Sequence, residues 1–161
     1  MRTILERTEM GGGYATTEEL VDAVARRLAA AGRRLTEHRR RVVGALAETP
    51  GPRTVAELTD ALGDAIPLSS LYRALAVLVE AGVVERLHEH DGVARYELSE
   101  VLVGHHHHLV CRRCGRVVDV AAGGDLDAAI DRLARRLGRR RGFRVRGHHI
   151  DFVGECERCP R

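Results

Sequence analysis

Residues 69–98 read SSLYRALAVLVEAGVVERLHEHDGVARYEL, and this stretch decides the fold predicted for the N-terminal part of the chain. Its first half places Leu71, Leu75 and Leu78 at the spacing of one helical face. Gly82 follows, a residue typical of helix ends because glycine adopts a left-handed conformation without strain. The first half therefore predicts an amphipathic helix that ends at a glycine.

The second half of the stretch predicts a two-stranded hairpin. Val83–Leu87 and Val93–Leu98 are strand-like runs. They are joined through Asp91-Gly92, a dipeptide that favours a tight turn. A helix followed directly by a small hairpin indicates a winged helix-turn-helix.

Three further helices are predicted upstream of this stretch. The apolar residues of Glu18–Ala31 recur at helical spacing. Thr36 can cap a second helix, which ends at the sequence Pro50-Gly51-Pro52. Thr54 and Glu57 have the spacing of a capping box, which predicts the start of a third helix. These helices complete the winged-helix unit.

A second unit of different character follows a hinge. It contains the strand-like runs His105–Cys111 and Arg116–Val120, a helix from about Asp125 to Gly138, and a last strand or pair of strands within Phe143–Val153. Because so small a unit buries little on its own, its exposed sheet and helix are candidate dimerisation surfaces. The expected fold class is α+β: an N-terminal winged helix-turn-helix (residues 1–98), a hinge (99–104) and a small C-terminal α/β dimerisation and metal-binding domain with structural zinc (105–161).

The composition narrows the classes of partner. With 3% aromatic residues and no Trp, the chain offers few platforms for base stacking. No apolar run approaches the roughly 20 residues of a membrane span, and Met1–Tyr14 has no apolar stretch of signal-peptide kind. We therefore expect a cytoplasmic protein with no membrane partner.

The net charge of +3 depends on clusters of arginine residues, which suit contacts with phosphate groups. Each cluster alone also fits a solvated basic face. The clusters are Arg39–Arg41, Arg135–Arg136 and Arg139–Arg141.

Four cysteines form the strongest motif, Cys111-x-x-Cys114 with Cys156-x-x-Cys159. Each pair can present two thiolates from one tight turn, and two such pairs complete a tetrahedral zinc shell. Four thiolates leave no open coordination position, so the predicted role of this Zn²⁺ is structural. Redox thiols of thioredoxin kind are the alternative, but they need a C-x-x-C pair that opens a helix after a buried strand.

Four consecutive histidines, His105 to His108, precede the first cysteine pair. On a strand, alternate side chains share a face, so His105 and His107 point one way while His106 and His108 point the other. Two different metal sites can therefore share this strand. A solvated run of histidines with no ligand role is the alternative.

Each histidine pair needs further ligands. His105 and His107 can be joined by His148 and by a carboxylate at the start of the helix predicted from about Asp125 to Gly138. This carboxylate is Asp127 or Asp125. The candidates to join His106 and His108 are Asp119 and two carboxylates of the wing: Glu85 and Glu97. A metal held by both units would fix their relative angle.

The helix within the opening stretch is the candidate DNA reader. Ser69 or Ser70 is expected to cap it, and its first turn also carries Tyr72 and Arg73. A recognition helix places this turn against base edges in the major groove, where arginine bonds guanine or phosphate. In the alternative interpretation Tyr72 packs on a neighbouring helix and Arg73 is ordinary surface.

Together these motifs resemble the ferric uptake regulator family over nearly the whole chain, from about Glu18 to Cys159. The resemblance is carried by Ala31-Gly32-x-Arg34-x-Thr36 with Arg39 or Arg40, Leu71-Tyr72-Arg73-x-Leu75, Glu80-Ala81-Gly82-Val83-Val84, the histidine run with its first cysteine pair, and His148 with Gly154-x-Cys156-x-x-Cys159. It implies a metal-loaded homodimer that binds palindromic operators in double-stranded DNA as a repressor, with no enzymatic activity and no small-molecule substrate.

The resemblance also implies roles for single residues. The four cysteines correspond to structural zinc ligands, and Tyr72 and Arg73 to the DNA-reading pair. His106 and His108 correspond to ligands of a regulatory sensor site, with Asp119 as a carboxylate ligand. The additional site would comprise His105, His107, Asp127 and His148.

The sensed metal, Zn²⁺ or Fe²⁺, is left open by departures from each branch of the family. The unbroken histidine run and Glu85 are similar to zinc-uptake regulators, but Ser99 replaces the cysteine expected there. Glu97 matches the iron branch, and Asp119 is of the type seen in peroxide sensors. Zinc is slightly favoured, with iron or peroxide sensing as alternatives.

Three other functions are weighed against metal-dependent regulation. Ser99 keeps open a constitutive DNA binder whose sensor site has decayed. A zinc-storage protein would need no DNA reader, which the recognition helix argues against. A zinc hydrolase would need a cleft with a general base, for which the sequence has no clear signal.

Overall fold

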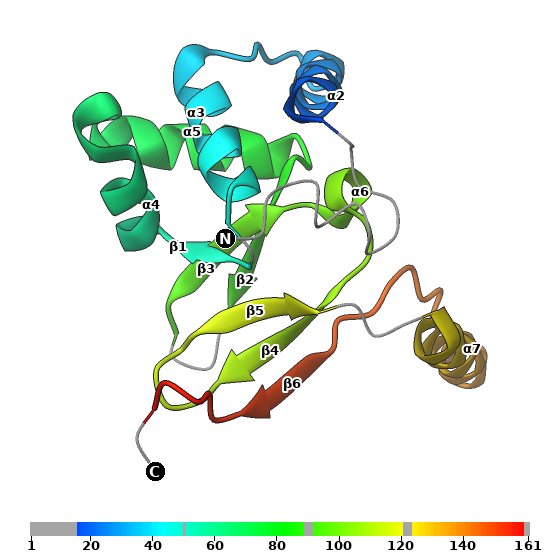
Figure 1. Ribbon diagram of the computed structural model, residues 1–161. Coiled ribbons are helices and arrows are strands. Elements are labelled where there is room, and N and C mark those ends of the chain that lie inside the picture. Colours follow the sequence, from blue (N-terminus) through cyan, green and yellow to red (C-terminus); the bar gives the residue numbers. More distant parts are fainter. Residues whose placement is uncertain (1–15, 50, 89–91, 121–123, 160–161) are drawn as a thin grey trace. The chain divides into compact units, whose positions relative to one another are not determined.

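The computed structural model describes residues 16–49, 51–88, 92–120 and 124–159. The chain divides into two compact units, Met1–His105 and His106–Arg161. The elements of the first unit are α2 (Thr17–Ala30), α3 (Glu37–Ala47), β1 (Arg53–Thr54), α4 (Val55–Leu62), the 3-10 helix η1 (Gly63–Ala65), α5 (Leu68–Glu80), β2 (Val84–His88), β3 (Ala94–Leu98) and α6 (Glu100–Val103). Those of the second unit are β4 (His107–Cys111), β5 (Val117–Val120), α7 (Gly124–Arg141) and β6 (Asp151–Gly154) (Figure 1).

Local hydrogen bonds begin the helices where the sequence predicts. The Thr36 side chain accepts a hydrogen bond from the amide of Arg39 at the start of α3. Thr54 and Glu57 form the complete capping box of α4, with each side chain accepting from the other residue's backbone. Each satisfies amide groups that the first helical turn leaves without a partner.

The start of α5 differs from the prediction. The helix begins at Leu68, and its N-cap residue is Pro67, which makes no side-chain capping bond. The Pro67 carbonyl accepts from the amides of Ser70 and Leu71, and this first turn is already helical. Ser69 and Ser70 therefore lie inside the helix, and the expectation that either caps it is wrong.

The first unit holds a continuous aliphatic core. The apolar stripe of α5 is buried, with Leu71, Leu75 and Leu78 each 1% exposed or less. It packs with helical residues that include Val24, Leu28, Val42, Val43, Leu46 and Leu58. β1, β3 and β2 form an antiparallel sheet in that order, so the predicted hairpin carries a third, short strand (Figure 1).

Some sequence predictions fall on residues outside the described ranges, namely Met1–Tyr14, Pro50 and the turn residue Asp91. The segment predicted as a hinge, residues 99–104, contains α6. Within the first unit, Leu102 is buried and the Ser99 hydroxyl donates to the Gly82 carbonyl over 2.9 Å.

The second unit contains a three-stranded sheet with β4 in the centre. β5 pairs with β4 antiparallel, and β6 pairs with it in parallel on the other edge (Figure 1). Both ladders are shorter than predicted, because pairing with β5 starts at His107 and pairing with β6 starts at Asp151. His105, His106 and the segment 143–150 therefore lie outside the strands.

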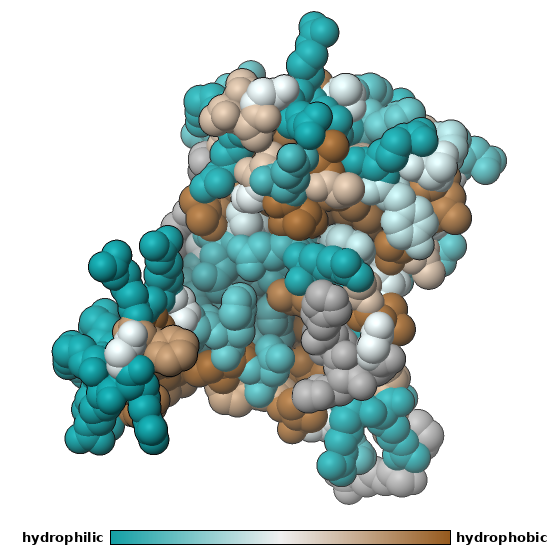
Figure 2. All heavy atoms as spheres, turned by 180° about the vertical axis from the view of Figure 1, so that it is seen from behind, coloured by the Kyte–Doolittle hydropathy of each residue, from teal (hydrophilic) through white to brown (hydrophobic). Residues whose placement is uncertain are grey.

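The long helix α7 leaves its apolar stripe uncovered in the single chain. Leu126, Leu133 and Leu137 are each more than two-fifths exposed. Figure 2 shows hydrophilic side chains gathered over α7, with hydrophobic surface between them. In the described part of the chain no single helix is long and apolar enough to cross a membrane, and only the bent pair Val55–Ala65 with Leu68–Glu80 reaches that composition jointly.

A glycine in α7 lets the chain after the helix pack closely. A Cβ atom added at Gly138 would lie 2.6 Å from the Phe143 carbonyl oxygen and 2.9 Å from Val145 Cγ2. The same turn is closed by a hydrogen bond of 2.8 Å from the Phe143 amide to the Gly138 carbonyl. Because the nearest atom is a backbone oxygen and not the end of a flexible side chain, a new methyl group would force the turn to shift.

We predict that Gly138→Ala destabilises the second unit by about 1–3 kcal/mol, despite the higher helix propensity of alanine, because the new methyl group clashes with backbone. Urea unfolding of this variant and of Gly124→Ala, where a Cβ would meet nothing within 4 Å, measures the difference. Equal midpoints for the two variants would contradict the prediction.

Candidate metal centres and recognition helix

The four cysteines converge at one end of the sheet. The Sγ atoms of Cys111 and Cys159 are 3.8 Å apart, and Cys156 Sγ lies 3.7 Å from those of Cys114 and Cys159. Zinc–sulfur bonds of about 2.3 Å place the corners of a tetrahedron about 3.8 Å apart. The separations therefore fit a zinc ion held by four thiolates and exceed a disulfide bond of about 2.05 Å.

The electrostatics of the thiols also fit a cation at their centre. Backbone amides of Cys156, Cys114 and Arg113 donate to the Cys111 sulfur and lower its pKa to about 6. The pKa of Cys159 is raised to about 12, mainly because the thiol is buried and secondly because it forms hydrogen bonds with the surrounding cysteines. Thiolates this close repel one another, so all four can be charged together only when a bound cation compensates them.

A first histidine group contains His108 of β4 and His106, which directly precedes that strand. The rings of His106 and His108 meet edge to face with centroids 5.2 Å apart. Asp119 of β5 is the direct cross-strand neighbour of His108, and its Oδ1 lies 3.8 Å from His108 Nε2. Ligand atoms of these three buried side chains lie within 4.8 Å of one another, a spacing that one metal ion can bridge.

A second group lies on the opposite side of the histidine run. His107 Nε2 is 2.8 Å from Asp127 Oδ1 at the start of α7. The His148 ring lies 5.7 Å from that of His107, centroid to centroid. The alternation predicted for the run thus holds in the second unit, since His107 faces Asp127 while His108 faces Asp119.

The remaining predicted ligands are described by their contacts within their own units. Asp125 is exposed and belongs to none of the potential metal-binding groups found among the described residues. His105 ends the first unit, where its Nδ1 lies 2.8 Å from Glu100 Oε1. Glu85 and Glu97 are direct cross-strand neighbours on β2 and β3, with Glu97 only 4% exposed and Glu85 half-buried.

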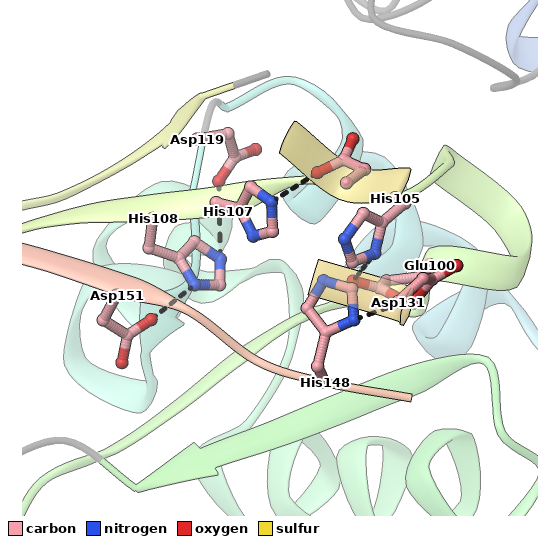
Figure 3. Close-up of polar contacts among 9 residues, drawn as sticks. Glu100, His105, His107, His108, Asp119, Asp131, His148 and Asp151 are labelled. Carbon is pink, nitrogen blue, oxygen red and sulfur yellow. Dashed lines mark hydrogen bonds and ion pairs between the residues drawn. The ribbon is translucent and has the colours of Figure 1, made fainter. Parts of the chain in front are cut away.

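Three carboxylates beside the histidines were missed by the sequence reasoning. Asp151 lies 3.3 Å from His108 Nδ1, Asp131 lies 3.4 Å from His148 Nδ1, and Glu100 pairs with His105 (Figure 3). Only Asp131 had a sequence signal, because it follows Asp127 by four residues and so shares its helical face. The pairing of Asp151 depends on the register between β6 and β4.

The candidate recognition helix presents its predicted DNA-reading residues to solvent. Tyr72 is 52% exposed, and Arg73 is also exposed. Arg73 Nη2 donates to Ser70 Oγ over 2.9 Å, and Ser69 is exposed one position earlier. On α3, Arg40 is exposed, while the half-buried Arg39 donates to the carbonyl of Arg34.

The two units together define a class of protein, a winged-helix DNA-binding regulator that carries metal-binding groups in a small α/β domain. The model of the ferric uptake regulator family matches residues 30–153. The chain belongs to this family of metal-responsive transcriptional regulators.

Individual relatives come from both the iron and the zinc branches. The chain is 32% identical to the ferric uptake regulation protein of Bacillus subtilis over 147 residues, covering 88% of this chain and 95% of that protein. It is 33% identical to the zinc uptake regulation protein of Mycobacterium tuberculosis over 136 residues, covering 82% and 98%. A solved structure of a zinc uptake regulator complexed with zinc and DNA superposes with a TM-score of 0.61 at 26% identity, covering 89% and 95%.

Proposed function

We propose that this protein is a cytoplasmic repressor that binds palindromic operators as a homodimer when a regulatory metal is bound. The observation that carries this proposal is the buried group of His106, His108 and Asp119. Family membership supplies the regulatory context. The four cysteines hold a structural zinc, and the exposed apolar stripe of α7 supports a surface that a second copy covers.

The regulatory metal takes a further carboxylate from the wing. Glu97 is the stronger candidate, because its carboxylate is only 4% exposed, as is usual for ligands of a buried metal site, whereas Glu85 is half-buried. Glu85 directly opposes it on the neighbouring strand, where two like charges destabilise the pair unless a cation lies beside them. A metal bound by the wing and by the histidine run would then fix the relative angle of the two units.

An additional metal is held by His107, Asp127 and His148. His105 joins them because it precedes His107 by two residues and shares its side of the run. Histidine nitrogens with one carboxylate form a donor set that suits Zn²⁺ or Fe²⁺.

DNA is read by the first turn of α5. Arg73 and Tyr72 reach base edges, while Ser69, Ser70, Arg39 and Arg40 contact the sugar–phosphate backbone. In a dimer the two recognition helices bind one palindrome only when they are about 34 Å apart, the spacing of successive major grooves. A metal that sets the angle of the winged units thereby controls operator affinity.

Zinc is slightly favoured over iron as the sensed metal. Its support is the unbroken histidine run and the 33% identity to a zinc uptake regulation protein. The comparable 32% identity to a ferric uptake regulation protein, together with Glu97, supports iron.

The test is a titration of palindromic DNA with protein stripped to its structural zinc, with Zn²⁺, Fe²⁺ and Mn²⁺ added separately without oxygen. Zn²⁺ alone is expected to raise DNA affinity about a hundredfold, a typical size for coupling between two binding sites. A response to Fe²⁺ or Mn²⁺ instead would reject zinc sensing. DNA affinity that ignores every metal would indicate a constitutive binder, and failure to bind DNA at all would reject the regulator in favour of zinc storage.

A further inference from the structure

The histidines of both groups use their two ring nitrogens in a consistent way. Nε2 of His108 faces Asp119, and Nε2 of His107 faces Asp127. These two carboxylates belong to the groups that can hold metal. Nδ1 of His108 and Nδ1 of His148 face the carboxylates that lie outside those groups (Figure 3).

We infer that Asp151 and Asp131 are positioning residues, each of which holds one histidine in the tautomer that has its lone pair on Nε2, the nitrogen that would bind metal. This inference rests on the proposed function, since it assigns His108 to the regulatory site and His148 to the additional site. Glu100 extends the pattern to His105, whose Nδ1 it also meets.

The register of the sheet brings His108 and Asp151 together. His108 stands on the central strand, with Asp119 opposite on β5 and Asp151 opposite on β6. Residues in register share a face of the sheet, so one row contains a carboxylate, an imidazole and a second carboxylate. The row places the two acids at opposite nitrogens of one ring.

Asp119 and Asp151 differ in how far their side chains are exposed to solvent. The Asp119 side chain is 3% exposed, whereas that of Asp151 is 43% exposed. A metal bound at Nε2 lies on the opposite side of the ring from the Nδ1 that Asp151 contacts. Asp151 therefore acts on the metal only through the imidazole.

The periodicity of α7 places Asp131 where it can contact His148. Asp127 and Asp131 are separated by one turn of α7 and share a face. Asp127 meets His107 Nε2, and one turn later Asp131 meets His148 Nδ1. One helix thus supplies both a ligand candidate and a positioning carboxylate.

The chemistry of imidazole explains what such a carboxylate contributes. A neutral imidazole carries one proton, and a carboxylate at Nδ1 favours the tautomer with the proton on that nitrogen. Nε2 is then left with a lone pair, and the hydrogen bond makes it a stronger base. Loss of such an outer partner costs 10–100-fold in metal affinity in typical metal sites.

The first experiment observes the tautomers in protein whose four-cysteine site holds zinc and whose histidine groups are free of metal. Two-bond 1H–15N spectra of 15N-histidine-labelled protein, recorded where the imidazoles are neutral, distinguish a proton on Nδ1 from one on Nε2. We expect His108 and His148 to carry the proton on Nδ1. Asp151→Ala should release His108 from this state, and Asp151→Asn should retain it because the amide oxygen still accepts.

The second experiment measures Zn²⁺ binding at each group by chelator competition, with the histidine 15N shifts showing which group fills. Asp151→Ala is expected to weaken binding at His106 and His108 by 10–100-fold and to leave His107 and His148 unchanged. Asp131→Ala should weaken binding at His107 and His148 and leave binding at His106 and His108 unchanged. Each variant removes one negative charge from the same unit, so each controls for the other.

The outcomes separate this inference from the proposed function. A proton on Nε2 of His108 in the unaltered protein, or equal weakening of both groups by either alanine variant, would overturn the positioning role. Unaltered protein whose His106 and His108 signals ignore Zn²⁺, Fe²⁺ and Mn²⁺ would instead overturn the sensor assignment, and the positioning role would fall with it.

Discussion

Cys156→Ser is expected to abolish binding of the structural zinc and to unfold residues 106–161 while the winged-helix unit remains folded. Among the described residues of the second unit, the buried apolar side chains are those of Val110 and Cys111. The continuous apolar core lies entirely in the first unit. Binding of structural zinc contributes on the order of 10 kcal/mol to the folding of small domains, more than so small a core supplies.

Zinc analysis by mass spectrometry and 1H–15N correlation spectra of the two units measure this effect. Glu157→Gln is the matched control, because it lies between Cys156 and Cys159 but offers no sulfur ligand. The control should retain the zinc and the dispersed signals of both units. A Cys156→Ser protein whose second unit keeps dispersed signals would show that this unit folds without the complete four-thiolate site.

The features that the sequence predicted well depend on interactions between near neighbours in the chain. The capping box of Thr54 and Glu57 needs only a spacing of three residues, and the stripe of α5 needs only the helical period. The alternation of the histidine run depends on extended backbone alone. Because these geometries do not depend on distant partners, residue spacing is enough to predict them.

The features that the sequence missed depend on contacts between distant segments. Asp151 and His108 are 43 residues apart and meet because β6 pairs with β4 in one particular register. A shift of that register by one residue would send the Asp151 side chain to the other face. His148 lies outside every described strand, so strand alternation does not explain its position beside His107, 41 residues earlier in the chain.

The start of α5 illustrates a different failure, in which two local signals compete. Serines at positions 69 and 70 favour a helix start, but Pro67 already supplies a helix-compatible φ of −57° and its carbonyl accepts the first helical bonds. The helix therefore begins before the serines. This shift leaves Ser70 one turn ahead of Arg73, where its hydroxyl accepts from the guanidinium group.

The double variant His106→Ala/His108→Ala is expected to lose the about hundredfold gain in operator affinity that the regulatory metal gives the unaltered protein. Both imidazoles belong to the first histidine group, and neither belongs to the four-cysteine site. The variant should therefore keep its structural zinc and its fold. His108 lies between Asp119 and Asp151 in the sheet, and its removal takes away the imidazole that contacts both carboxylates. The carboxylates that remain are expected to hold metal weakly.

Fluorescence anisotropy of a labelled palindromic duplex, with and without metal, measures the change. His149→Ala is the control, because His149 is exposed and belongs to neither histidine group. Its metal response should equal that of the unaltered protein. If the double variant responds to metal like the control, the coupling passes through the other histidine group, which His107→Ala would then remove. If it binds DNA tightly without metal, these histidines hold the unaltered protein in a low-affinity state that metal relieves, and metal binding would act by releasing this restraint.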